Sequence, residues 1–360
     1  MRTLLRCCVF FASLGLLMAV ATVPCHAQQV DSMYGPLPVF EFHSGFWVNL
    51  HHFLYHEARA RLAAQDVTKS SDGKLGTPAI KSARLSATEQ KTWDDAISYY
   101  MANYAEKDMV INIDLILLKN QLEDFEDCDE VTGRKQSRCD AGLPGKIGPI
   151  LDSVAPIYRA HWWPDQDRSN RRWVIKVAPL VREQGVGISE RLADIYQTRW
   201  PRDKIRVDVC AFADSAGAYT TLDPLRVTIA STDPRNQGPQ ALEVLFHEAS
   251  HGIAAPVETA ISRECKQRNK PIPRDLWHAL IIYTTMEVVQ PVFTDSAQDR
   301  ANANGSLPPP KSSAVPYALQ DVLSQRGWDQ YHLLLDLYWQ PYLNGRVTFD
   351  DAIAHLISAA

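Results

Sequence analysis

The residues best suited to chemistry are two histidines and a glutamate within the run His247-Glu248-Ala249-Ser250-His251. This is the HExxH pattern. On a helix, residues four apart lie one turn above each other on the same face, so both imidazoles could reach one ion. Neutral imidazole is a preferred ligand of Zn²⁺. The sequence therefore predicts a zinc site that includes His247 and His251.

Glu248 lies beside the first of these histidines and could point at a water molecule bound to the same ion. The ion would lower the pKa of that water toward about 7, and a carboxylate could then take its proton. The hydroxide would attack a carbonyl group that the ion also polarises. We therefore expect Glu248 to act as a general base and later to donate the proton to the leaving amine.

A catalytic zinc site needs a third protein ligand, and two candidates share one apolar helical segment. His278 and Glu287 are nine residues apart, so they lie on opposite sides of a straight helix and cannot both bind the ion. Glu287 is an isolated charge among apolar residues, which costs free energy unless it is paired. We expect Glu287 to be the third ligand, with His278 as the alternative. Tyr283 lies on the face of Glu287 and is either a hydrogen-bond donor to the developing oxyanion or a core aromatic residue.

These side chains must be positioned by helices and a small sheet. Pro239 suits the first position of a helix that would carry HExxH, with Leu242, Leu245, Phe246 and Ala249 on its apolar face. Alternating residues over 205–212 and 225–231 predict two strands before it. We also expect a strand at 173–180. Helices are predicted at 44–64, from Ser86 to about 107, and at 110–122, 188–200, 276–289, 329–343 and 349–358.

The run LEVLFHEASHGI on a helix that follows a strand resembles the zincin superfamily of zinc metallopeptidases. A later apolar helix with Glu287 makes the chain similar to the gluzincin branch, in which a downstream helix supplies a glutamate ligand. The resemblance covers about residues 205–290. It implies peptide or protein substrates, and an edge strand beside the active helix that pairs with an extended substrate. The segment LRVTIAS is the expected edge strand.

Composition narrows the remaining choices. The 360 residues are 46% hydrophobic and 22% charged, which is typical of a globular chain. Their 37 basic and 42 acidic residues are scattered, which argues against nucleic-acid binding. Residues 1–27 have the pattern of a secretory signal peptide, and no later segment is long and apolar enough to span a membrane. We therefore expect an exported protein.

The expected fold class is α+β and mainly helical, with an N-terminal helical region at 28–150 and a zincin-like catalytic region at 151–360. The two regions could form one compact domain. In an exported chain the four later cysteines suggest a Cys128–Cys139 disulfide, with Cys210 and Cys265 as the remaining pair or as buried thiols.

A second group of histidines, His51, His52 and His56, shares one predicted helix. His52 and His56 are four apart and could hold another metal, although we interpret the group as an ordinary helix face. Taken together, the sequence predicts an exported zinc hydrolase, most plainly a peptidase. The alternatives are a secreted zinc-binding or interaction protein without turnover and a zinc hydrolase of a non-peptide amide.

Overall fold

A computed structural model of the chain describes residues 28–29, 37–65, 83–126, 142–303 and 320–360. The predicted signal peptide and the Cys128–Cys139 pair lie outside these residues. Within them no helix has the length and apolar character needed to cross a membrane. Cys210 and Cys265 are buried free thiols in two different hydrophobic clusters, so a disulfide between them is excluded here.

One mixed sheet lies at the centre of the protein, with strand order β1-β2-β3-β5-β4. β2, β3 and β5 are parallel to one another, while β1 and β4 run antiparallel to their neighbours. The predicted strands at 205–212 and 225–231 are confirmed as β3 and β5. Their bounds are β1 Gln28–Gln29, β2 Phe40–Ser44, β3 Ile205–Cys210, β4 Ala218–Leu222 and β5 Leu225–Ala230.

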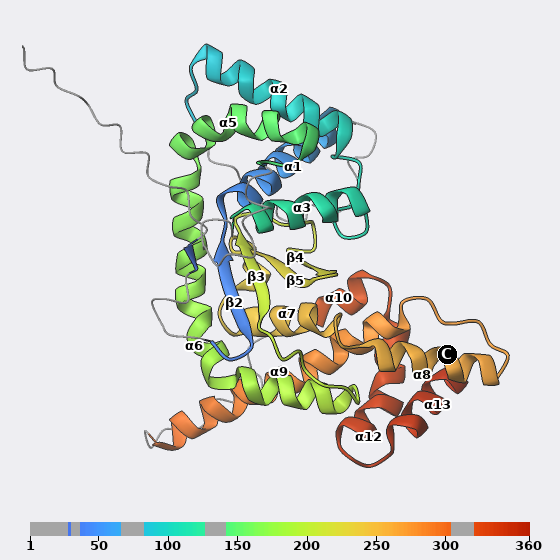
Figure 1. The fold of residues 1–360 in the computed structure, drawn as a ribbon. Helices are drawn as coiled ribbons and strands as arrows, with labels where there is room; N and C mark the ends of the chain where they lie inside the picture. The colour runs from blue at the N-terminus through green and yellow to red at the C-terminus, as the bar shows by residue number, and fades with distance from the viewer. Residues whose placement is uncertain (1–27, 30–36, 66–82, 127–141, 304–319) are drawn as a thin grey trace, which may run out of the picture.

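Helices surround this sheet and make the protein mainly helical, so the predicted α+β class is confirmed (Figure 1). In chain order they are α1 Phe46–Gln65, α2 Ala87–Asn103, α3 Ile113–Glu126, α5 Gly148–His161, α6 Trp163–Ile195, α7 Pro239–Ser250, α8 Ala255–Gln267, α9 Leu276–Ala303, α10 Gln320–Gln325, α11 Asp329–Leu334, α12 Gln340–Leu343 and α13 Phe349–Ala359. A π-helical turn, Leu335–Trp339, joins α11 to α12.

The two faces of the sheet contact different helices because side chains alternate along each strand. Phe40, Val207 and Ile229 point toward α6 and α7 and belong to the larger hydrophobic cluster. The helices α1, α2, α3 and α5 lie together at the end of the molecule away from α7 and α9 (Figure 1). They pack around a second hydrophobic cluster. β2 comes from the N-terminal region yet pairs with β3, and residue 150 lies inside α5. The two predicted regions therefore contribute strands to one sheet.

The strand expected at 173–180 is wrong, since these residues lie within the long helix α6. Val174, Val177, Ala178 and Val181 are all buried, and their spacing of three and four places them on one helical face. The β-branched side chains suggested a strand, but the period of the buried positions is that of a helix.

Polar residues fill the space between α3 and the sheet. The Lys119 ammonium lies 2.7 Å from a Glu123 carboxylate oxygen, and both side chains are almost completely buried. Glu123 also accepts a hydrogen bond from Arg226 of β5. One oxygen of Glu126 accepts from the backbone N–H groups of Trp47 and Val48 at the start of α1. Charged side chains buried at this depth are stable only when such partners surround them.

Glu126 should make the stability of the fold depend on pH. Burial raises the pKa of its carboxyl group to about 8, although Arg206 opposes the shift. The folded protein therefore holds this proton between about pH 4.5 and 8, where the unfolded chain has released it. The free energy of unfolding should fall as the pH rises through this range, by an amount on the order of a few kcal/mol.

We predict that Glu126→Gln will weaken this pH dependence, because the amide has no proton to lose. Urea unfolding of both proteins at pH 5 and pH 8.5, with a chelator present, measures the effect. Glu190→Gln on the exposed surface of α6 is the control. An unchanged difference between the two pH values in Glu126→Gln would show that this carboxyl group is not the source.

Candidate functional site

The helix α7 carries the HExxH residues as the sequence predicts. It begins at Pro239, which has no backbone N–H to leave unsatisfied, and it packs against the sheet and α6. Leu242, Leu245 and Phe246 are fully buried in the larger cluster. This packing fixes the rotation of α7 about its axis and leaves His247 and Glu248 on the side that faces a cleft.

His247, His251 and His278 form one compact group. Each offers a ring nitrogen, and the three nitrogens lie within 4.8 Å of one another. The Nε2 atoms of His247 and His278 are 3.3 Å apart. The first two residues come from α7 and its C-terminal cap, and His278 comes from the first turn of α9, which packs on α7. This group could hold a metal ion.

The environment keeps these imidazoles neutral, which is the form that binds metal. Burial lowers the pKa of His247 well below its ordinary value and lowers the pKa of His251 to about 4. The pKa of His278 falls to about 3, mainly through burial. Trp277 stacks on His278, with ring centroids 5.2 Å apart, and Trp328 meets its edge. These indoles exclude water and restrict the orientation of the ring.

Glu248 is held beside the three histidines by β4. The hydroxyl group of Thr220 donates to its carboxylate at 2.7 Å and also lies 2.8 Å from its backbone carbonyl oxygen. Burial raises the pKa of Glu248 to about 8, while the Thr220 hydrogen bond opposes the shift and the charge of Asp214 adds to it. A carboxyl group with this pKa can both accept and release a proton near neutrality.

The site opens into a cleft of about 780 Å³ that follows β4. β4, and not LRVTIAS, is the edge strand of the described sheet, since LRVTIAS is β5 and is paired on both sides. The sequence suggested the wrong strand because a tight turn hides β4 directly before β5. Exposed apolar side chains form part of the cleft wall, namely Ile111, Ile113 and Leu222.

Glu287 does not join the histidine group, so the expected ligand set requires correction. Its carboxylate accepts a hydrogen bond from the Gln340 side chain at 3.1 Å. The physical reason is the nine-residue spacing, because α9 turns His278 toward α7 and therefore turns Glu287 to the opposite side. Among the described residues the third member is His278, the alternative that the spacing left open.

Tyr283 lies on the Glu287 side of α9 and does not line the cleft. Its hydroxyl group lies 2.7 Å from a carboxylate oxygen of Asp336 and 2.9 Å from the Gln340 side-chain oxygen. The expected contact with an oxyanion is therefore absent from this arrangement, and Tyr283 is a core aromatic residue whose hydroxyl is satisfied. Gln340 thus contacts Tyr283 and Glu287, two of the residues that the sequence had suggested for the site.

The histidines of α1 form no metal group within the described chain. The Nδ1 atom of His51 lies 2.9 Å from the Tyr100 hydroxyl, and the Nε2 atom of His52 lies 2.8 Å from the Tyr219 hydroxyl. His56 instead stacks on a phenylalanine ring. These contacts connect α1 to α2 and to β4, which agrees with an ordinary helix face.

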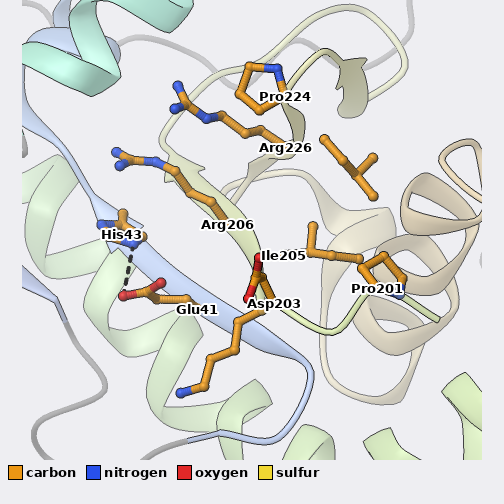
Figure 2. Close-up of a pocket in the computed structure, with 10 residues that line it drawn as sticks. Glu41, His43, Pro201, Asp203, Ile205, Arg206, Pro224 and Arg226 are labelled. Carbon is orange, nitrogen blue, oxygen red and sulfur yellow. Dashed lines mark ion pairs between the residues drawn. The ribbon is translucent and has the colours of Figure 1, made fainter.

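A second cavity, of about 430 Å³, lies where β2, β3 and β5 begin (Figure 2). The Nε2 atom of His43 lies 3.6 Å from a carboxylate oxygen of Glu41 within it. Its arginines are already neutralised, because Arg206 pairs with Asp208 and Arg226 pairs with two acidic residues of α3. Among the described residues that line this cavity, no group of three possible metal ligands occurs.

Two residues of the first cleft had no clear signal in the sequence. Thr220 was visible only as part of a polar stretch before a predicted strand, and Arg326 lies in a loop far from HExxH along the chain. No family model, curated protein or solved structure matches this chain. Its zincin resemblance therefore depends on the motif and its setting.

We predict that His278→Ala will weaken metal binding by more than about 100-fold, because losing a ligand should cost at least as much as losing a partner of a ligand. Glu287→Gln should leave the affinity unchanged. Calorimetric titration of the metal-free proteins with Zn²⁺ measures both. The opposite result, with affinity lost in Glu287→Gln and kept in His278→Ala, would restore the ligand set first expected from the sequence.

Proposed function

We propose that this protein is a zinc-dependent hydrolase that cleaves peptide bonds in an extended chain. The observation that carries the proposal is the meeting of three neutral imidazoles and the carboxyl group of Glu248 at one cleft. Three protein ligands leave a fourth position for water, as catalytic zinc sites require. The run of residues 1–27 supports export of the protein.

The distance between two of the three ring nitrogens agrees with zinc as the ion. Zinc–nitrogen bonds of about 2.0–2.1 Å at a tetrahedral angle place two ligand nitrogens about 3.3 Å apart. The Nε2 atoms of His247 and His278 have this separation. A set of imidazoles without thiolate also suits other transition ions, whereas Mg²⁺ and Ca²⁺ prefer oxygen ligands. A histidine as third ligand differs from the gluzincin pattern, although a downstream helix still supplies it.

Each residue of the site has its own role in the proposed hydrolysis. A bound ion would lower the pKa of water and polarise the scissile carbonyl group. Glu248 takes the proton of the attacking water and returns it to the departing amine. Thr220 holds the Glu248 carboxylate in place. The outer edge of β4 pairs with no other strand of the described sheet and offers backbone groups to an extended substrate. The apolar side chains at 111, 113 and 222 favour a substrate with a bulky apolar residue.

A zinc-binding protein without turnover is the main alternative. A fourth protein ligand and a closed site would favour it, but the described group contains three histidines beside a large cleft. The position of this cleft along a sheet edge favours an extended peptide over a compact non-peptide amide.

We predict that Glu248→Gln will retain the metal and lose hydrolysis by about 10²–10⁴-fold, because the amide cannot accept the proton. Digestion of a broad peptide library by wild type and variant, with metal content measured on the same samples, tests this. Equal turnover by the two proteins would remove Glu248 from the mechanism. Absence of cleavage by zinc-loaded wild type would favour the binding protein.

Thr220→Val should also keep the metal, since the hydroxyl group contacts Glu248 and no histidine of the group. Loss of one hydrogen bond to the carboxylate should reduce kcat by about 10-fold or more while KM changes little. Steady-state kinetics on a peptide from the library measures the two constants. A change confined to KM would instead indicate that β4 acts through substrate binding alone.

A further inference from the structure

Arg326 lies at the cleft between α10 and α11, far from HExxH in the sequence. Its guanidinium group lies over the ring of Trp328, with the central carbon 5.0 Å from the ring centroid. Trp328 in turn meets the edge of His278, with centroids 5.5 Å apart. A cation held on an indole face has a restricted position. Arg326 is therefore held near the histidine group although its side chain is exposed.

The charge of Arg326 has no acidic partner in the part of the chain that the structure describes. Among the residues that the structure describes, no acidic side chain forms an ion pair with it. The other arginine of the cleft, Arg235, differs because its guanidinium lies 2.6 Å from a carboxylate oxygen of Asp233.

Acidic side chains of the cleft belong to other segments. Asp214 and Asp223 lie before and after β4. Burial raises the pKa of Asp214 to about 7, and its carboxylate accepts a hydrogen bond from the Ala216 N–H. Neither carboxylate forms an ion pair with Arg326 in the described structure. The cleft therefore has a positive charge on its α10–α11 side and acidic groups around β4.

We propose that Arg326 binds a carboxylate group of the substrate and so selects peptides that carry this charge close to the scissile bond. The inference rests on the proposed peptidase function. Guanidinium and carboxylate match in shape and can form two parallel hydrogen bonds. The carboxylate is either the C-terminus of the peptide, which would make the protein a carboxypeptidase, or an acidic side chain within it.

Two pairs of peptides separate these sources. The first pair has one apolar sequence that ends in a free carboxylate or in a carboxamide. The second pair is blocked at both ends and has glutamate or glutamine beside the expected cleavage position. Calorimetry with zinc-loaded Glu248→Gln protein measures binding without turnover. We expect the carboxylate form of one pair to bind at least about 10-fold more tightly than its neutral form.

Adding Arg326→Met to this protein should abolish the preference, and Arg326→Lys should restore part of it through charge alone. Arg274→Met is the control, because that side chain is 93% exposed and lies outside the cleft. Equal affinity for charged and neutral peptides, or no binding of any of them, would overturn the inference.

Kinetics on protein with Glu248 intact distinguish the two proposals. Cleavage of charged and neutral peptides at the same kcat/KM, with no effect of Arg326→Met, would overturn carboxylate selection and leave the peptidase standing. A carboxylate preference in binding without cleavage of any peptide would instead count against the peptidase. In that case Arg326 would belong to a binding site beside the metal.

Discussion

The packing of α9 against α7 is the constraint on which the site depends. It brings His278 to His247 of α7 and to His251 at the C-terminal cap of this helix. Burial disfavours the imidazolium form, so the rings stay neutral, and one ring nitrogen of each lies within 4.8 Å of the others. If this group holds a cation, the binding free energy would add to the stability of the fold.

The two sides of α9 have separate roles. One side presents His278 to α7, and the other presents Tyr283 and Glu287 to Gln340 of α12. These contacts with α12 help to fix the rotation of α9 about its axis, and this rotation turns His278 toward α7. Trp339 strengthens this contact, since its indole N–H donates to the Thr284 hydroxyl at 2.8 Å. Glu287, the isolated glutamate of this apolar helix, belongs to the contact with α12 and not to the histidine group.

The sheet contributes on both of its faces. Its apolar face fixes α7, while the polar residues between α3 and β5 join the N-terminal helices to the edge beside the cleft. Lys119 illustrates the connection, because its ammonium contacts both Glu123 of α3 and the Thr221 hydroxyl of β4. The N-terminal half thus supports β4, the strand whose Thr220 holds Glu248.

Much of this could be predicted from local pattern. HExxH on a helix from Pro239, the strands β3 and β5, the helix from Ser86 and the mainly helical class follow from periodicity and capping, which neighbouring residues decide. Helical spacing also shows that only one of His278 and Glu287 can face an ion. Which of them does so depends on the rotation of α9, and that is set by contacts with α7 and α12 that lie far away in the sequence. Tertiary packing likewise decided that β4 is the edge, that Cys210 and Cys265 stay apart, and that Arg326 meets the cleft, because each depends on contacts between distant segments of the chain.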